Sequence, residues 1–302
     1  MLAGAIYGAG RLLGALPVPV ALAIGRGLGT AAHAAMAGPR GLARTHLALA
    51  FPELPAVEHR RLARETFRHA GESFAELVLF PKLARRPSYV DVVGTGALDA
   101  ALARGQGAIA VTGHAGNWEL LAAWAALLGY PLTVIVRRVN DLRFHSLIVR
   151  FRLAAGVEVL VRDDPGFLSA VRDALRRNRV VAILIDQDTR GAGVFVPFFG
   201  RLARTPPGAA LLALRTGAPL VTTFIQRRPG GGHLIRVAPV DAAERGASRG
   251  VAALTARLTA AIEAQIRCAP AEWVWWHERW RRRPPSVPGM RVVTTLDGTS
   301  RS

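Results

Sequence analysis

The stretch Val111-Thr112-Gly113-His114-Ala115-Gly116-Asn117-Trp118-Glu119-Leu120 joins two apolar segments of different periodicity. Ala108 to Val111 is a short apolar run that ends at a glycine, whereas Trp118 to Leu128 has the spacing of an apolar helix. Asn117 is a favourable N-cap, and Glu119 falls in the first helical turn, where the helix dipole favours a carboxylate. The stretch therefore predicts a strand, a loop that presents a histidine, and a helix.

His114 precedes this helix and Glu119 lies inside it, so the imidazole can fold back over the helix start and be hydrogen-bonded by the carboxylate. An imidazole that a carboxylate holds in one tautomer can take a proton from a hydroxyl near neutral pH. We therefore interpret His114 and Glu119 as a candidate catalytic pair. The alternative interpretation is that His114 is a turn residue and that Glu119 is only a charge at the helix start.

Beyond residue 89 the chain alternates short β-branched runs with helical segments, which is the βαβ pattern of an α/β fold. We expect a central, mostly parallel sheet flanked by helices. Such sheets carry their chemistry at the carboxyl ends of the strands, where His114 lies. The expected strands are Tyr89 to Val93, Ala108 to Val111, Leu132 to Val136, Val157 to Val161 and Val180 to Ile185, and then a hairpin of Leu220 to Gln226 and His233 to Val237. The expected helices elsewhere are Glu58 to Leu79, Pro206 to Arg215 with Thr205 as its N-cap, and Val251 to Cys268.

The N-terminal region sets the expected domain organisation. Between Arg11 and Arg26 about fourteen residues carry no charge, which is too few for a clean membrane span, and two prolines interrupt them. We interpret residues 1–36 as an apolar, membrane-associating helical segment that is interfacial or re-entrant, with a plain core helix as the alternative. Residues 37–284 are expected to form a single domain, and the polar tail of residues 285–302 is expected to be disordered.

The charge balance of the chain is strongly basic. The 302 residues include 39 Lys and Arg against 21 Asp and Glu, a formal net charge of +18, and Lys82 is the only lysine. This excess predicts attraction to phosphates, whether of nucleic acid or of an anionic membrane surface. The single cysteine, Cys268, excludes an intrachain disulfide and a cysteine-rich zinc site and is compatible with a cytosol-facing location. Hydrophobic residues make up 51% of the chain, which excludes disorder for its body.

Three further segments carry candidate site residues. Asp186-Gln187-Asp188-Thr189 follows an expected strand, and its acids can bind a metal, pair with arginines or cap the turn. Val194 to Arg201 is rich in aromatic residues, which can line a fatty chain or belong to the core. Pro270 to Pro284 combines four tryptophans with four arginines, which is typical of a membrane boundary or of stacking on bases, and it can also be a closing helix packed on the sheet.

Several motifs of nucleophilic and phosphate-binding sites are absent from the sequence. There is no G-x-S-x-G, no H-E-x-x-H, no Walker loop and no strand-anchored G-x-G-x-x-G. Without a convincing nucleophile, a base that activates the hydroxyl of a substrate is the most economical mechanism.

Four motifs, taken together and in this order, resemble those of the bacterial lipid A biosynthesis acyltransferases of the lauroyl and myristoyl type. These enzymes are relatives of the glycerolipid acyltransferases that carry an H-x4-D/E motif. The resemblance runs from about Leu16 to Pro284. The motifs are the His114 to Glu119 spacing, Asp186-Gln187-Asp188, Val196-Pro197-Phe198-Phe199-Gly200 and Trp275-x-His277-x-Arg279-Trp280-x-x-Arg283-Pro284.

This resemblance implies that a fatty acyl group moves from a thioester, on acyl carrier protein or coenzyme A, to a hydroxyl of a phosphorylated membrane glycolipid, most directly a lipid A precursor. His114 would be the general base and Glu119 its orienting partner, in an acyltransferase domain of residues 37–284. The reaction would run at the cytoplasmic face of the inner membrane, on an anionic surface. It would need no nucleic-acid partner, no metal and no cofactor beyond the acyl thioester co-substrate, while the tetrahedral oxyanion would need hydrogen-bond donors nearby.

The resemblance also implies which residues contact the substrates. Guanidinium groups bind phosphate bidentately, so arginines at the family's positions would clamp the phosphates of the acceptor. The expected substrate contacts are Arg137, Arg150, Arg152, Arg162, Asp186 and Asp188, and the expected acyl pocket contains Phe198 and Phe199.

The sequence departs from the family at Val136-Arg137-Arg138, where members often have Tyr-Arg-Pro, and this departure leaves the acceptor open. Phosphatidylinositol mannoside acyltransferases of the mycobacterial type share the architecture with Asp in place of Glu, and Glu119 favours the lipid A branch. Two other classes remain alternatives. One is a basic nucleic-acid or membrane-binding module without catalysis, and the other is a thioesterase that uses water.

Overall fold

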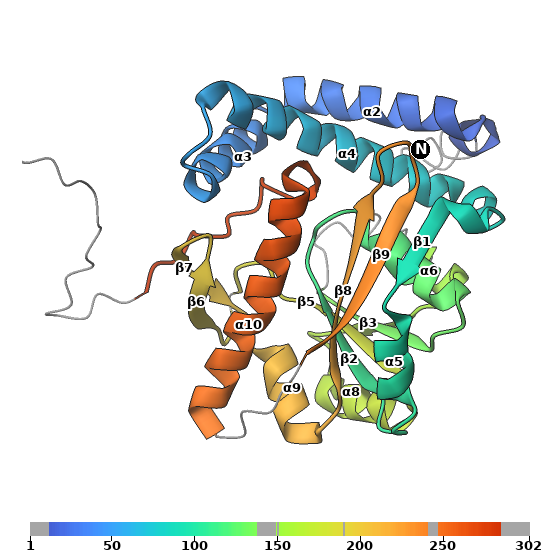
Figure 1. Ribbon diagram of the computed structural model, residues 1–302, viewed down its shortest axis with the longest axis vertical. Coiled ribbons are helices and arrows are strands. Elements are labelled where there is room, and N and C mark those ends of the chain that lie inside the picture. Colours follow the sequence, from blue (N-terminus) through green and yellow to red (C-terminus); the bar gives the residue numbers. More distant parts are fainter. Residues whose placement is uncertain (1–11, 138–148, 150, 190, 241–246, 285–302) are drawn as a thin grey trace, which may run out of the picture.

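A central sheet of seven strands runs through the molecule (Figure 1). Its strands are β1 (Val90–Val93), β2 (Ala108–Thr112), β3 (Leu132–Val136), β4 (Glu158–Val161), β5 (Val180–Leu184), β8 (Leu220–Arg227) and β9 (His233–Val240). They lie in the order β1-β9-β8-β2-β5-β3-β4, and all neighbours pair in parallel except β8 and β9, which form the predicted antiparallel hairpin. The computed structural model describes residues 12–137, 149, 151–189, 191–240 and 247–284. The predicted α/β fold with a mostly parallel sheet is confirmed.

Helices cover both faces and one end of the sheet (Figure 1). The helices are α2 (Val18–Ala35), α3 (Ala37–Ala50), α4 (Ala56–Leu83), α5 (Thr95–Leu102), α6 (Trp118–Leu127), α8 (Phe167–Arg176), α9 (Gly208–Thr216) and α10 (Ala247–Cys268), with single 3₁₀ turns at Pro87–Tyr89 and Pro270–Glu272. A separate antiparallel hairpin consists of β6 (Val194–Phe198) and β7 (Arg201–Thr205). Asn117 caps α6 as predicted, because its side-chain oxygen accepts the backbone N–H of Leu120 at 3.1 Å.

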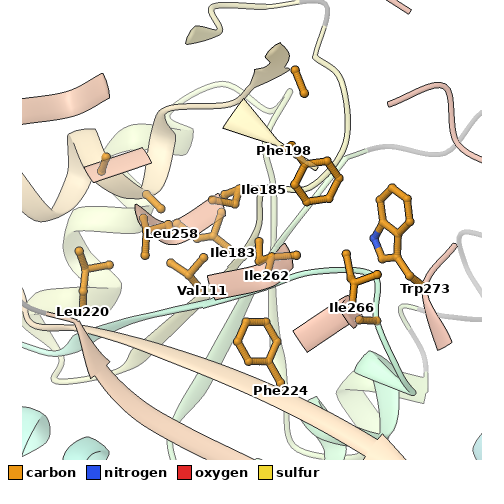
Figure 2. Packing of buried hydrophobic residues seen from close by; sticks show 14 of the residues in the cluster. Val111, Ile183, Ile185, Phe198, Leu220, Phe224, Leu258, Ile262, Ile266 and Trp273 are labelled. Atoms are coloured by element: carbon orange, nitrogen blue, oxygen red, sulfur yellow. The ribbon is translucent and has the colours of Figure 1, made fainter. Parts of the chain in front are cut away.

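Both faces of strand β2 are buried, which explains why its sequence is almost continuously apolar. Ile109 and Val111 belong to the core cluster under α8, α9 and α10 (Figure 2), whereas Ala108 and Ala110 belong to the cluster under α5 and α6. Successive side chains of a strand point to opposite faces, so a strand between two helical layers is apolar at every position. All five residues of β2 are buried. This buried strand carries the loop that presents His114.

Helices α2 and α4 cross at glycines with almost no space between their backbones. A Cβ atom added at Gly29 would lie 2.2 Å from the carbonyl oxygen of Phe67, and one added at Gly71 would lie 2.1 Å from the carbonyl oxygen of Gly25. Any residue with a Cβ atom would therefore clash at these positions, since a backbone carbonyl cannot move aside as the tip of a side chain can, and only glycine fits. The crossing fixes α2 on α4 across the end of the sheet (Figure 1).

The prediction of a membrane-associating segment at residues 1–36 is tested only in part, because residues 1–11 lie outside the described residues. Residues 18–35 of the segment form α2. None of the helices in the described ranges combines the length and the apolar character needed to cross a membrane. Residues 285–302, for which we predicted disorder, also lie outside the described residues.

Two local predictions were wrong. Thr205 does not cap a helix: it is the last residue of β7, and α9 begins at Gly208 with Pro207 at its N-cap and no side-chain capping bond. The tryptophan-rich segment is not a helix beyond its 3₁₀ turn, although it packs on the core as the closing helix was expected to do, with Trp273 and Trp275 1% and 0% exposed. These rings pack into the main core, where apolar burial stabilises the closing segment.

Candidate active site

The register of the sheet brings His114 and Asp186 together. Strand β2 pairs with β5 so that Thr112 lies opposite Leu184, and each of the two site residues follows its strand by the same short step. The Nδ1 atom of His114 lies 2.8 Å from Oδ1 of Asp186, across a sequence separation of 72 residues. The carboxyl ends of two adjacent parallel strands thus provide a histidine–carboxylate pair.

Asp186 is 1% exposed and accepts hydrogen bonds from three N–H groups. Besides the ring of His114, they are the backbone N–H of His114 at 2.6 Å and Nε1 of Trp273 at 2.7 Å, both on Oδ2. Burial by itself raises the pKa of Asp186, but the charge of His114 and the hydrogen bonds from His114 and Trp273 outweigh it and hold the pKa well below its usual range. An ionised carboxylate only accepts, so Nδ1 of His114 carries a proton, and in the neutral ring Nε2 is then the acceptor.

The predicted hydrogen bond between Glu119 and His114 was wrong. Glu119 instead binds Arg152 through two contacts, from Nε to Oε2 at 2.8 Å and from Nη2 to Oε1 at 2.5 Å. The reason is tertiary: β5 lies beside β2, and Asp186 at its end occupies the Nδ1 side of the imidazole. Glu119 therefore holds an arginine at the cavity, and Asp186 is the carboxylate that orients the imidazole.

Two further side chains adjoin the imidazole. The amide nitrogen of Gln187 lies 3.1 Å from Nε2 of His114 and 2.8 Å from Nε2 of His277. The ring of Trp118 packs edge-on against the ring of His114, with 5.0 Å between the ring centroids. Sequence reasoning did not select Gln187 as a site residue, although it stands between the two acids of the turn that follows β5.

A cavity of about 900 Å³ opens in front of His114. Its wall is formed by α4, by the start of α6, by the ends of β3 and β5, and by the tryptophan-rich segment, and three of the predicted arginines line it. Arg137 and Arg162 are both exposed at the cavity, whereas Arg152 is held by Glu119. Arg150 lies outside the described residues.

A narrow apolar slot of about 80 Å³ lies between α6 and the sheet. Small side chains leave this space: Ala122 and Ala125 of α6 face Ala110 and Ala182 of the sheet. The slot and the large cavity share lining residues, namely Trp118, Glu119, Ile135, Val136, Arg152 and Leu184. The two spaces are therefore adjacent, with a charged mouth on the cavity side and an apolar interior on the other.

Residues 2–282 match the family described as bacterial lipid A biosynthesis acyltransferase. The chain belongs to this family. The family predicted from the four motifs is thus confirmed, and its defining histidine is the one that faces the cavity.

Named relatives of the family fall in two groups. Phosphatidylinositol mannoside acyltransferase of Mycolicibacterium smegmatis is 31% identical over 281 residues, which cover 91% of this chain and 90% of the relative. The protein of the same name from Mycobacterium tuberculosis is 32% identical over 230 residues, which cover 75% of this chain but only 64% of the relative. Lipid A biosynthesis lauroyltransferase of Escherichia coli is 29% identical over 285 residues, which cover 90% of this chain and 89% of the relative.

Asp188 lines the cavity of this family member, whereas Asp186, the other predicted substrate contact of the turn, is buried behind the imidazole. Both carboxylate oxygens of Asp188 are buried, and neither has a hydrogen-bond partner among the residues that the structure describes. The nearest cations are Nε of Arg281 at 3.7 Å and Nε of Arg282 at 3.8 Å, beyond hydrogen-bond distance. A buried carboxylate without hydrogen bonds is costly, so Asp188 is suited to accept a hydroxyl or amide from a bound molecule.

Phe198 and Phe199 do not form an acyl pocket. They are 0% and 5% exposed and line neither of the two cavities. Phe198 packs against Trp273 and Trp280, each with 5.6 Å between ring centroids, and Phe199 packs against Phe51 at 5.3 Å. Aromatic rings in such contact leave no room for a chain, so this part of the family motif belongs to the core.

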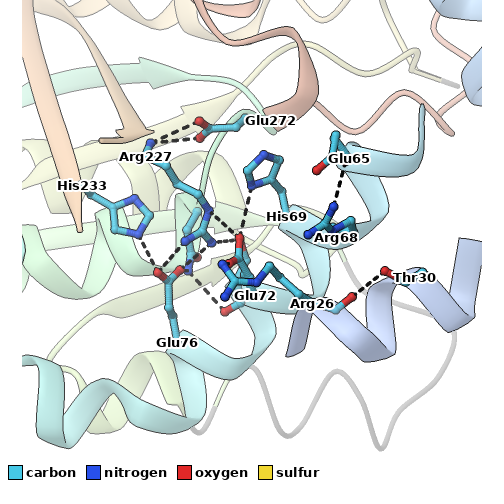
Figure 3. Close-up of polar contacts among 12 residues, drawn as sticks. Arg26, Thr30, Glu65, Arg68, His69, Glu72, Glu76, Arg227, His233 and Glu272 are labelled. Carbon is cyan, nitrogen blue, oxygen red and sulfur yellow. Dashed lines mark hydrogen bonds and ion pairs between the residues drawn. The ribbon is translucent and has the colours of Figure 1, made fainter. Parts of the chain in front are cut away.

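A second buried network supports the start of α6 (Figure 3). Its centre is Glu76 of α4, which is 0% exposed and accepts from His233 at 2.7 Å, from Arg227 at 2.7 and 2.8 Å, and from the amide of Asn117 at 2.8 Å. Burial raises the pKa of Glu76, but the hydrogen bond from His233 and the charge of Arg227 lower it far more, so that the group is ionised. The network thereby fixes the N-cap of the helix beside His114. In the sequence, only the position of Glu76 on the apolar face of α4 could have indicated this network.

Asp186→Asn is expected to reverse the tautomer of His114. Two N–H groups donate to Oδ2 of Asp186, so the oxygen of an asparagine takes that place and its NH₂ group turns toward Nδ1. Nδ1 then becomes an acceptor and the ring proton moves to Nε2. Imidazole nitrogen chemical shifts measured by NMR distinguish the two tautomers. The control is Glu119→Gln, which leaves the proton on Nδ1; an Asp186→Asn protein whose ring keeps the proton on Nδ1 would contradict the assignment.

Proposed function

We propose that this chain transfers a fatty acyl group from an acyl thioester to a hydroxyl of a phosphorylated membrane glycolipid. The observation that carries the proposal is the Asp186–His114 pair, whose imidazole faces a cavity with arginines on one side and an apolar slot on the other. Membership of an acyltransferase family supports the same chemistry. Acyl thioester on acyl carrier protein or coenzyme A is the proposed donor.

The geometry supports a direct transfer with His114 as the base. Nε2 of His114 takes the proton of the acceptor hydroxyl while the hydroxyl oxygen attacks the thioester carbonyl carbon. The resulting tetrahedral oxyanion collapses, the carbon–sulfur bond breaks, and the leaving sulfur receives the proton from the imidazolium. Asp186 stays ionised and stabilises the imidazolium in between, as its three N–H contacts favour.

The acceptor is proposed to carry both phosphate and sugar hydroxyls. Arg137 and Arg162 line the cavity with no hydrogen-bonded or close carboxylate partner among the described residues, except for Asp163 at 3.7 Å from Arg162, and they suit a phosphate. Asp188 with its unused carboxylate oxygens suits a sugar hydroxyl. A lipid A precursor is the first candidate acceptor. The higher identity to phosphatidylinositol mannoside acyltransferases, 31–32% against 26–29%, favours a mannosylated phospholipid as the second.

His114→Ala is expected to lower acyl transfer by about 10²- to 10⁴-fold, the usual contribution of a general base. Purified protein is incubated with acyl carrier protein and coenzyme A thioesters and with each of the two glycolipids in vesicles, and mass spectrometry identifies the acylated product. His33→Ala on α2 is the matched control, because His33 lies outside the cavity lining. An equally active His114→Ala protein would refute the proposal.

Two product patterns separate the other classes of function. Fatty acid released at the same rate without any acceptor lipid identifies a thioesterase. Steeply salt-dependent binding of RNA, without turnover of any thioester, identifies a nucleic-acid-binding module.

The apolar slot is the proposed site of the fatty chain, in place of Phe198 and Phe199. It begins where Trp118 and Leu184 border the large cavity, and it continues between alanines of α6 and the sheet. A chain whose carbonyl carbon lies at His114 can bury its methylenes there, at about 0.8 kcal/mol for each CH₂ removed from water. The depth of the slot would then select the chain length.

Ala125→Leu is expected to shift the preferred donor to a chain several carbons shorter, because the larger side chain fills the slot that Ala125 lines. Rates are compared over a series of thioesters of increasing length. Leu127→Phe serves as the control, since Leu127 is 48% exposed on the same helix and lies outside the slot. An unchanged length preference in Ala125→Leu, with full activity, would place the chain elsewhere.

Helix α2 is the proposed contact with the membrane, at the cytoplasmic face of the inner membrane. Val20, Ile24 and Leu28 recur at helical spacing and are 46%, 40% and 59% exposed. Exposed arginines accompany this stripe on the same helical layer, among them Arg26 and Arg64. An apolar stripe flanked by guanidinium groups suits an anionic lipid surface, where apolar burial and charge attraction add.

The variant Val20→Ser/Ile24→Ser/Leu28→Ser is expected to lose most of its binding to vesicles that contain anionic phospholipid, because the stripe supplies the apolar area. Co-sedimentation with anionic and neutral vesicles measures the bound fraction. The control variant Leu168→Ser/Leu202→Ser removes two exposed leucines of α8 and β7 and keeps wild-type binding. Equal binding by both variants would exclude α2 as the contact.

A further inference from the structure

The side-chain amide of Gln187 bridges two imidazoles at the cavity. Its nitrogen lies 3.1 Å from Nε2 of His114 and 2.8 Å from Nε2 of His277. A primary amide carries two hydrogens, and both contacts are hydrogen bonds only if each imidazole nitrogen is unprotonated. For His114 this condition is met, because Asp186 holds the ring proton on Nδ1.

Burial lowers the pKa of His277 to about 4, so its ring is neutral around neutral pH. In the tautomer that carries its proton on Nδ1, Nε2 of His277 accepts from the Gln187 amide at 2.8 Å. The backbone N–H of His277 donates to the carbonyl of Val274 and that of Arg279 donates to the carbonyl of His277, which fixes the turn that carries the ring. Arg279 itself is 1% exposed and is held by Thr205 at 2.6 Å. His277 is thus a neutral acceptor on a rigid support.

We propose that Gln187 donates the hydrogen bond that stabilises the tetrahedral oxyanion, and that His277 is the positioning residue that holds the Gln187 amide. This inference rests on the proposed acyl transfer and adds a donor for the negative charge that the reaction creates. Neither residue changes its covalent bonds, and the proton still travels from the acceptor hydroxyl to His114 and on to the leaving sulfur.

Substrate binding frees one N–H of the Gln187 amide from its hydrogen bond to His114, close to where the oxyanion forms. The attacking hydroxyl has to donate to Nε2 of His114, so it displaces Gln187 from that nitrogen. The second amide hydrogen stays on His277, at the shorter distance, and limits the displacement. The released N–H then borders the point where the hydroxyl oxygen meets the carbonyl carbon. A donor left unpaired in such a site is unfavourable, and an oxygen that becomes negative is its best available acceptor.

Two backbone N–H groups of the His114 loop are already used inside the protein. The N–H of His114 donates to Asp186 at 2.6 Å, and that of Gly116 donates to the carbonyl of Glu272 at 2.9 Å. Neither can serve the oxyanion without breaking a contact that holds the loop. Gln187 offers a side-chain donor at the cavity, which it lines together with His277.

Gln187→Met keeps the length of the side chain and removes its donor. It is expected to lower kcat by about 10²- to 10³-fold, the loss typical of one oxyanion donor. KM for donor and acceptor is expected to change by less than about twofold, because the bond forms only as charge develops. Initial rates over both substrate concentrations separate kcat from KM, and Gln187→Ala, which also lacks a donor, has to show the same split.

His277→Leu tests the positioning role. It is expected to lower kcat by less than Gln187→Met, and the double variant is expected to be no slower than Gln187→Met alone, because His277 acts through the amide. Thermal unfolding of each variant is measured alongside, and the matched control is Gln226→Met, a glutamine of β8 that does not line the cavity.

The outcomes separate this inference from the proposed function. If the wild type transfers acyl groups, His114→Ala is inactive and Gln187→Met keeps more than a third of the wild-type kcat, the oxyanion role is overturned and the acyltransferase proposal stands. Additive losses for Gln187→Met and His277→Leu overturn the positioning role. A wild type that acylates no lipid and cleaves no thioester overturns both proposals.

Discussion

The buried carboxylate of Asp186 is the contact on which the site depends. A charge that is 1% exposed has to be matched by donors, and the three N–H groups that match it come from the loop after β2 and from the tryptophan-rich segment. Around it the same two segments pair through a backbone bridge between Ala115 and Trp273. Gly113 is needed here because a Cβ atom would lie 3.0 Å from Oδ2 of Asp186 and 2.9 Å from Ile262. One carboxylate therefore joins the catalytic loop, β5 and the end of the domain.

A second buried carboxylate, Glu76, likewise joins distant elements and holds the other end of the loop. It joins α4 to β8 and β9 through Arg227 and His233 (Figure 3), and it holds the amide of Asn117, the N-cap of α6. The loop from His114 to Asn117 is thus held by a buried carboxylate at each end, Asp186 at His114 and Glu76 at Asn117. Such networks are stable only when every partner is in place, so the loop has little freedom to change the direction in which it presents the ring.

The charged and apolar parts of the cavity are lined by different elements of the fold. Arginines follow β3 and β4, whereas alanines of α6 and the sheet leave the apolar slot. The aromatic and tryptophan-rich motifs of the family, by contrast, build the core that closes over α10 and β6, as the packing of Phe198 against Trp273 shows. Residues that are distinctive in the sequence can therefore be structural, and small residues such as Ala125 can define the space for a ligand.

The α/β fold, most of the strands, the capped helix after His114 and the family could be predicted from the sequence alone, because these depend on local periodicity and on motifs. The sequence also predicted that the chemistry would lie at the carboxyl end of β2. Which carboxylate contacts the imidazole, by contrast, depends on how distant segments pack. Glu119 is near in the chain and Asp186 is not, but the order of strands places β5 beside β2, and no local pattern encodes that order. The burial of Phe198 and Phe199, the slot under α6 and the bridge made by Gln187 likewise depend on packing between distant segments, which is set by the whole fold.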